Sequence, residues 1–175
     1  SWNILGHSFG GLLASLYTTK HPECIDKLVY SSSGGLDLGF LSYVNDEISS
    51  KLSSDNKKNL ALWSQKINAG DTTYNARYQR GLALAPAYVY NKQFVPQLAD
   101  RLTQGNATIN QLVFKDLSKI NYNCNKELSS FTKPVLIIQG DVDIIREETA
   151  QIAKKTMPQA KIIVLKNCGH YGWLD

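Results

Sequence analysis

Four short apolar runs recur along the chain, two near its beginning and two near its end. Each is bounded by glycine, proline or polar residues, as β-strands commonly are. The runs cover Trp2–Leu5, Lys27–Ser32, Val135–Ile138 and Ile162–Leu165. A segment with apolar residues at helical spacing follows the first run, and a second helical segment follows the third. This alternation of strand and helix predicts an α/β fold with a parallel sheet.

The third run, Val135–Ile138, is apolar at every position. Continuous runs of this kind are typical of strands that are buried on both faces of a sheet. The helix expected after it has Glu147 and Glu148 at its start and Lys154 near its end, an arrangement that suits the helix dipole. We therefore expect a buried strand followed by a helix that packs on the sheet.

The stretch between the second and third strands has a different character. It is polar, rich in Asn, Lys, Tyr and Ser, and mostly helical in pattern. The helices expected in it cover Leu41–Leu52, Asn56–Ile67, Thr73–Ala85, Lys92–Leu102 and Ile109–Ile120. We call this stretch, residues 37–131, the helical insertion. The chain is thus divided into a first core segment (1–36), the helical insertion (37–131) and a second core segment (132–175).

Composition and charge narrow the functional class. Apolar residues make up 43% of the chain, which is enough for a core. The net charge of +4 comes with scattered lysines, so there is no basic stripe of the kind that binds nucleic acid. No apolar run approaches the roughly 18–20 residues of a membrane-spanning helix. Cys24, Cys124 and Cys168 have no metal-ligand spacing, so we expect free thiols and no metal.

The turn after the first strand carries the clearest chemical pattern. Gly6-His7-Ser8-Phe9-Gly10 has the Gly-x-Ser-x-Gly form of a nucleophile elbow, in which a sharp strand-to-helix turn exposes a serine hydroxyl. Gly6, Gly10 and the following Gly11 provide the small residues that let strand and helix approach each other. The backbone N–H of Phe9, at the helix start, is placed to stabilise an oxyanion.

A nucleophilic serine needs a base, and three histidines are available. His7 lies inside the elbow, where we expect it to point away from the site and pack or hydrogen-bond locally. His21 lies at a helix end closed by a proline, where a solvated histidine is common. His170 follows an apolar strand and a turn with Gly169, which places it at the carboxyl end of a strand, at the same sheet edge as Ser8. We therefore predict His170 as the base.

The acid that orients the base should also follow a strand. Gly140 ends the third apolar run, and Asp141 and Asp143 come after it. Asp141 is close enough to the glycine to satisfy turn amides, whereas Asp143 is far enough along to reach a histidine loop. We favour Asp143 and keep Asp141 as the alternative. The order Ser8, Asp143, His170 is the order of the α/β hydrolases.

With these residues in place, the chain resembles an α/β hydrolase over essentially its whole length. The segments "LGHSFGGLLASLYTTKHPE", "PVLIIQGDVD" and "CGHYGWLD" resemble the proline-iminopeptidase-like branch of that family. The resemblance implies a serine hydrolase without a metal or organic cofactor, acting on a short peptide or another small molecule. It also implies that the helical insertion is the cap, or lid, over the site. "IIREE" follows the acid where such enzymes often carry a proline.

The resemblance further implies that the chain is an internal fragment, the C-terminal portion of an α/β-hydrolase sheet with a mostly helical cap. In the family the elbow follows the fifth strand of an eight-stranded sheet, and a second oxyanion donor comes from a loop before that strand. With the natural N-terminus expected to be missing, a signal peptide cannot be judged, and a cytoplasmic location is only the default. The oligomeric state is open.

The substrate is less defined than the reaction. An N-terminal aminopeptidase would need a carboxylate to bind the free ammonium, and the insertion acids considered for this role are Asp46, Glu47, Asp71 and Asp100. None lies in a recognisable motif, and each is expected to be a solvated helix charge. Most insertion tyrosines, Tyr74 and Tyr78 among them, are expected to pack between helices rather than line a pocket. A carboxylesterase or other acyl hydrolase is the alternative, and a non-catalytic binding module of the same fold is a weaker one.

Overall fold

The computed structural model describes residues 1–175 and contains one parallel sheet with strand order β1-β2-β3-β4. The four strands are β1 (Trp2–His7), β2 (Ile25–Ser31), β3 (Val135–Gly140) and β4 (Lys161–Leu165). The helices of the two core segments are α1 (Phe9–Lys20), η1 (Pro22–Cys24) and α8 (Glu147–Thr156). These elements confirm the predicted α/β fold, with boundaries that differ by one or two residues from those expected.

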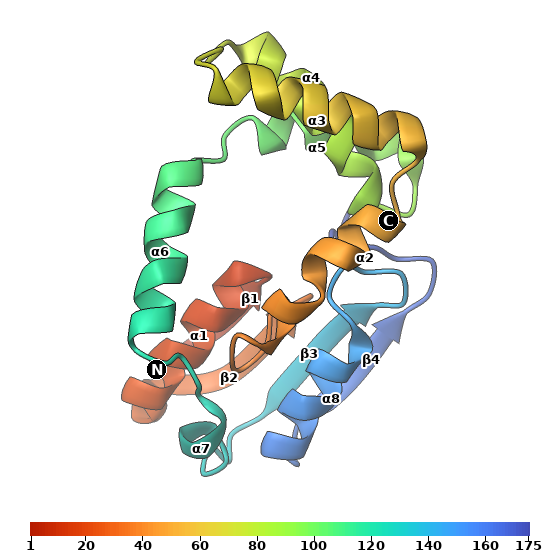
Figure 1. The fold of residues 1–175 in the computed structure, drawn as a ribbon. Helices are drawn as coiled ribbons and strands as arrows, with labels where there is room; N and C mark the ends of the chain where they lie inside the picture. Colours follow the sequence, from red (N-terminus) through yellow and green to blue (C-terminus); the bar gives the residue numbers. More distant parts are fainter.

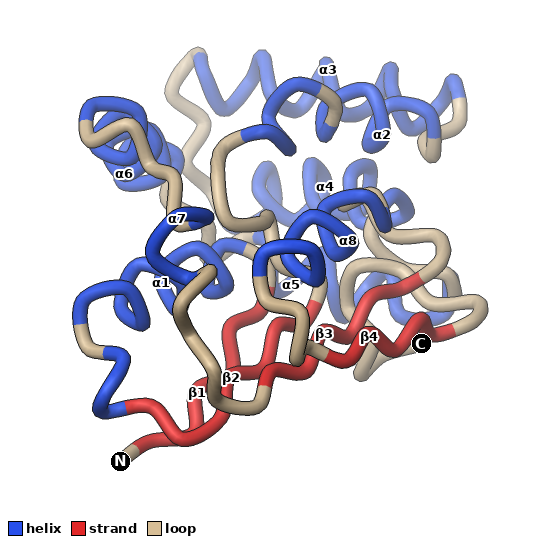
Figure 2. The backbone as a smooth tube through the Cα atoms, turned by 90° about the horizontal axis from the view of Figure 1, so that it is seen from below, coloured by secondary structure: helices blue, strands red, loops and turns tan.

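The helices of the core lie on one face of the sheet (Figure 2). Leu28, Tyr30 and Ile137 point to this face and pack with α1 and α8 around Leu12 and Met157. This apolar core holds the strands in register. It also places Ser15 against Tyr30, whose hydroxyl groups lie 2.7 Å apart.

The opposite face of the sheet is more open. The expectation that the strand Val135–Ile138 is buried on both faces was therefore wrong. Within β3, Val135 and Ile137 are buried, but Leu136 and Ile138 are only half-buried. On the outer strands the same face exposes Leu5 (65%) and Ile163 (47%). The continuous apolar run therefore does not mark burial on both faces among residues 1–175, since the core helices α1 and α8 cover the same side.

The helical insertion contains α2 (Val44–Ser50), α3 (Ser54–Asn68), α4 (Tyr74–Leu84), α5 (Val95–Leu102), α6 (Ala107–Lys119) and α7 (Asn125–Leu128), with short 3-10 turns η2 (Gly39–Ser42), η3 (Ala85–Ala87) and η4 (Lys92–Phe94). In Figure 1, α3, α4 and α5 stack beyond one end of the sheet, and α6 runs back toward α1 and the core. Three of these helices begin at side-chain caps, which Ser53, Thr73 and Asn106 provide.

Two of the expected insertion helices are interrupted. The segment Leu41–Leu52 divides at Tyr43, whose hydroxyl lies 2.5 Å from Thr149 Oγ1 of α8. The segment Lys92–Leu102 divides before Val95, and Pro96 sits in the first turn of α5, where its missing N–H costs nothing. Tyr74 is 58% exposed and stacks on Tyr78 instead of packing between helices.

The parallel sheet sets the position of the functional loops. All four strands end at the same edge, so the loops after β1, β3 and β4 emerge side by side beneath the insertion.

None of the helices combines the length and apolar character that crossing a membrane requires.

Candidate active site

Ser8 occupies the turn between β1 and α1 with φ 53° and ψ −119°, a strained conformation for a residue that is not glycine. Close packing enforces the turn. A Cβ on Gly6 would lie 2.5 Å from the Gly10 carbonyl oxygen, and one on Gly11 would lie 2.1 Å from Ser33 Oγ. A Cβ on Gly10 would meet nothing, so the expected need for glycine there is wrong. The elbow depends on Gly6 and Gly11.

His170 meets Ser8 at the end of its own loop. Its Nε2 lies 2.8 Å from Ser8 Oγ, and its imidazole is almost fully buried. A backbone hydrogen bond attaches the histidine loop to the insertion, because the His170 N–H donates to the Tyr88 carbonyl at 2.7 Å. A side chain on Gly169 would clash with the same carbonyl at 2.5 Å. The ring is thus held by a close backbone contact as well as by its own hydrogen bonds.

Asp143 completes the chain of hydrogen bonds. Its Oδ1 lies 2.7 Å from His170 Nδ1, and its side chain is fully buried. A carboxylate only accepts, so Nδ1 carries the proton, and Nε2 of the neutral ring is free to accept from the Ser8 hydroxyl. Burial alone would raise the pKa of Asp143, but the adjacent His170 and the Ile145 N–H hold this pKa below its usual value.

The alternative acid, Asp141, lies elsewhere. Its Oδ1 accepts from the Cys168 N–H at 3.3 Å, and its Oδ2 lies 3.6 Å from Lys166 Nζ. Asp141 therefore joins the loop after β3 to the loop after β4, the turn-stabilising role considered for it. It makes no hydrogen bond to His170.

His7 is not a local packing residue, contrary to expectation. Its Nε2 donates to the carbonyl of His170, 163 residues away, over 2.8 Å. The two imidazole rings are 4.8 Å apart, and Trp173 packs edge-on at 4.6 Å. Burial and the nearby His170 lower the pKa of His7 to about 4, so the ring is neutral near pH 7. His7 therefore links the elbow directly to the histidine loop.

Three further residues support the site, and two of them, Gln139 and Asp175, were missed by sequence reasoning. Gln139 is buried at the end of β3 and donates to Asp143 Oδ2 at 2.9 Å and to the Ile145 carbonyl at 2.8 Å. Tyr88 packs its ring edge-on against His170. The Asp175 carboxylate accepts from the N–H of Gly169 at 2.7 Å. The only sequence signal for any of these residues is that Gln139 is a single polar residue between the apolar run Val135–Ile138 and Gly140.

The three cysteines are free thiols, as expected. Burial raises the pKa of Cys168, two residues from His170, to about 11, so this thiol is not a thiolate near pH 7. No group of three potential metal-ligating side chains forms in the structure.

A family model described as the alpha/beta hydrolase fold matches residues 1–175. The chain belongs to the α/β-hydrolase family. Two curated lipases are similar to it. Lipase 1 of Psychrobacter immobilis is 23% identical over 176 residues, which cover 96% of this chain and 49% of that protein. Lipase 3 of Moraxella sp. (strain TA144) is 22% identical over 170 residues, covering 96% of this chain and 50% of that protein. The chain thus spans about half the length of the curated relatives it matches.

Solved structures of this family share the fold. An alpha/beta fold family hydrolase from Bacillus anthracis str. Sterne superposes with a TM-score of 0.74 at 19% identity, covering 97% of this chain and 61% of that one. The 2-hydroxy-6-oxo-6-phenylhexa-2,4-dienoate hydrolase from Rhodococcus sp. strain RHA1 superposes with a TM-score of 0.62 at 18% identity. The match covers 98% of this chain and 58% of that one. At these identities the likeness concerns the fold alone.

A large cavity of this α/β hydrolase lies between the insertion and Phe9 of the elbow, and neither Ser8 nor His170 is among the residues that line it. It measures about 680 Å³, within the range of small-molecule sites. Residues of α3, α4 and α6 form its walls, and Phe9, next to Ser8, is the core residue that lines it. The Phe9 ring packs edge-on against that of Phe114 of α6, with ring centroids 5.7 Å apart.

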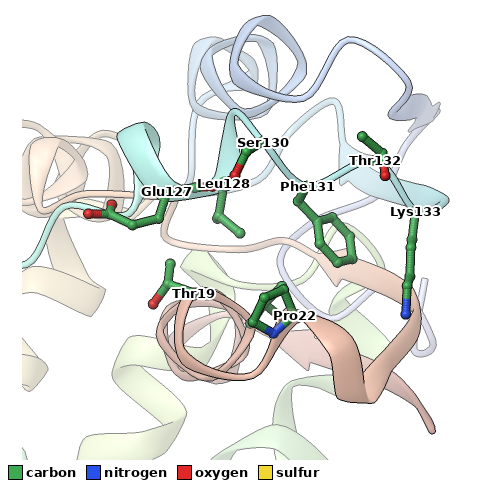
Figure 3. Close-up of a pocket in the computed structure, with 9 residues that line it drawn as sticks. Thr19, Pro22, Glu127, Leu128, Ser130, Phe131, Thr132 and Lys133 are labelled. Carbon is green, nitrogen blue, oxygen red and sulfur yellow. Dashed lines mark hydrogen bonds between the residues drawn. The ribbon is translucent and has the colours of Figure 1, made fainter.

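A second cavity of about 330 Å³ lies at the other end of α1 (Figure 3). Thr19 and Pro22 face Leu128, Phe131 and Lys133 across it. Thr19 is eleven residues along from Ser8, so this cavity is about 16–17 Å from the elbow at the rise of an α-helix. It contains no nucleophile with an adjacent base, and we assign it no part in the chemistry.

Proposed function

We propose that this α/β hydrolase is a serine hydrolase that works by acyl transfer through Ser8, His170 and Asp143. The observation that carries the proposal is the continuous hydrogen-bond chain from Ser8 Oγ to His170 (2.8 Å) and from His170 to Asp143 (2.7 Å). The three residues come from three different strand ends. Hydrogen bonds from a serine to a histidine and from that histidine to a carboxylate are the arrangement that activates a serine hydroxyl.

In the first half-reaction, Ser8 Oγ attacks the carbonyl carbon of the substrate while His170 Nε2 takes the hydroxyl proton. Asp143 holds the ring in the Nδ1–H tautomer and stabilises the imidazolium that forms. The N–H of Phe9 is in the first turn of α1 and has no intrahelical acceptor, so it is available to the oxyanion. Collapse of the tetrahedral intermediate returns the proton from His170 to the leaving group and leaves an ester on Ser8.

In the second half-reaction, water replaces the leaving group. His170 takes a proton from the water, the resulting hydroxide attacks the acyl-enzyme carbonyl, and the proton passes to Ser8 Oγ as the acid is released. His7 stays neutral through both steps, since its pKa lies near 4. The positive charge is therefore confined to the ring that Asp143 faces.

We keep the proline-iminopeptidase-like aminopeptidase as the proposed activity and the carboxylesterase as the alternative. An aminopeptidase must hold a free ammonium, and no aspartate or glutamate lines the large cavity. Glu47 is paired with Arg146 at 2.6 Å, and Asp100 accepts from the Tyr74 hydroxyl at 2.6 Å. This arrangement favours testing esters beside peptides. We also propose residues 37–131 as the cap, because its helices form most of the cavity wall.

The test starts from the full-length protein. A fluorophosphonate probe is expected to label Ser8, and Ser8→Ala is expected to abolish labelling; Ser42→Ala, which alters an exposed serine of the insertion, is the matched control. A panel of proline arylamides and short acyl esters then assigns the substrate. Labelling that persists in Ser8→Ala would refute the nucleophile. A protein that is unlabelled and inactive on the whole panel would favour the non-catalytic binding module.

A further inference from the structure

The large cavity between the insertion and the elbow has an unusual charge. Its only charged lining residues are Arg77 and Arg80, and no aspartate or glutamate lines it. The two arginines are three residues apart on α4, so their side chains are neighbours on the helix surface. Like charges at this spacing repel each other, and neither guanidinium forms an ion pair with a carboxylate.

The hydrogen bonds of the two arginines leave most of their donors free. Arg80 Nε donates to Ser64 Oγ of α3 at 3.0 Å, and Arg77 donates to the Thr72 carbonyl at 2.6 Å. Each guanidinium thus uses one of its five N–H donors on the protein. Both bonds go to neutral acceptors, so they orient the arginines without neutralising them.

The rest of the cavity has neutral walls. Apolar side chains of Phe9, Ile67, Leu102, Ile109 and Val113 line it, together with several asparagines. An apolar chain in the cavity can therefore run between Phe9, the residue after Ser8, and the two arginines. The planar fork of a guanidinium matches a carboxylate in two parallel hydrogen bonds.

We propose that this cavity binds an acyl group that ends in a carboxylate, with Arg77 and Arg80 as its receptor and the scissile carbonyl at Ser8. The proposal rests on the proposed serine hydrolase function, and it names the class of acyl donor. It predicts that a negative charge at the far end of the acyl chain improves binding, whereas an apolar pocket of the same size would prefer a methyl group there.

The test compares two esters of equal acyl length, 4-nitrophenyl octanoate and the mono-4-nitrophenyl ester of octanedioic acid. The full-length protein is expected to hydrolyse the octanedioate ester with kcat/KM at least about tenfold higher. Arg80→Gln and Arg77→Gln are each expected to lower kcat/KM for that ester by about tenfold or more, and to change it for octanoate by less than about threefold. Arg80→Lys should fall between wild type and Arg80→Gln.

Lys58→Gln is the matched control, because it removes one positive charge from an exposed position on α3 that does not line the cavity. It is expected to leave the ratio between the two esters unchanged. An equal or lower kcat/KM for the octanedioate ester, or a ratio that both arginine variants leave intact, would overturn the proposal while the serine hydrolase function stands.

If neither ester is hydrolysed, a binding measurement distinguishes failure of the proposed anion site from failure of the proposed hydrolase activity. Calorimetry on the Ser8→Ala protein is expected to detect octanedioate but not 1,8-octanediol, and Arg80→Gln in that background is expected to abolish the heat of octanedioate binding. Octanedioate binding without hydrolysis by the wild type would leave the anion site standing and refute these esters as substrates. No difference between the two ligands would refute the anion site itself. Circular dichroism of each variant checks that the fold is intact.

Discussion

Replacing His7 by glutamine should flatten the dependence of stability on pH between 7.5 and 4.5. Burial and the neighbouring His170 lower the pKa of His7 from 6.5 to about 4. The unfolded chain therefore binds this proton more readily than the folded one. The neutral ring stabilises the fold fully above pH 6.5 and loses that contribution as the pH falls from 6.5 toward 4. Glutamine cannot take up the proton but can still donate to the His170 carbonyl.

The size of the effect follows from the two pKa values. Their difference corresponds to at most about 2.5 kcal/mol of unfolding free energy lost between pH 7.5 and pH 4.5. The ring is half-buried, so solvent screening reduces this to about 1–2 kcal/mol. Asp143 does not interfere, because its pKa lies below 3.8 and its contribution is lost only at lower pH.

The assay is urea unfolding of the full-length protein at several pH values, followed by tryptophan fluorescence. Wild type should lose about 1–2 kcal/mol more than His7→Gln between pH 7.5 and 4.5. His21→Gln, which changes an exposed histidine, should behave like wild type. Equal pH dependence in wild type and His7→Gln would show that His7 is not held neutral by the fold, and the reasoning would fail.

Three further predictions concern the triad, its support and the sheet. Asp143→Asn should lower kcat by about 10³–10⁴-fold, while Asp141→Asn should cost only about 1 kcal/mol of stability; a larger loss of kcat in Asp141→Asn would reverse the assignment. Gln139→Met should lower kcat at least about tenfold with KM nearly unchanged, as steady-state kinetics would reveal, and unchanged kcat would remove Gln139 from the site. Residues 1–175 expressed alone should self-associate in light scattering, because β1 is an edge strand and Leu5 is 65% exposed. Leu5→Lys should reduce this association, and a monodisperse wild-type chain of residues 1–175 would contradict the prediction.

The positions of Ser8, Asp143 and His170 could be predicted because each depends on local sequence. A glycine turn after an apolar run marks a strand end, and parallel strands end at one edge. The choice between Asp143 and Asp141 also followed from the sequence alone, because Asp143 lies farther from Gly140 and can extend to the histidine loop. The triad geometry agrees with that choice, since the 2.7 Å contact to His170 is made by Asp143.

Other features depend on partners that are distant in sequence. His7 bonds to a carbonyl 163 residues away, and the predicted helix Leu41–Leu52 is interrupted at Tyr43, whose hydroxyl bonds to Thr149 of α8. The burial of β3 could not be read from its composition, because an apolar run does not reveal how many faces are covered. The charge of the cavity likewise appears only when the fold brings Arg77 and Arg80 of α4 to the same cavity as residues of α3 and α6.

The histidine loop is attached to the insertion at several points. The Tyr88 carbonyl accepts from the His170 N–H, and the Asp175 carboxylate accepts from the N–H groups of Tyr90 and Asn91 as well as from Gly169. The loop that carries His170, the proposed base, is therefore bonded to the insertion, whose helices form most of the cavity wall. We expect mutations that reshape the insertion to change the distance between His170 and Ser8 as well, so that substrate preference and turnover number would evolve together rather than independently.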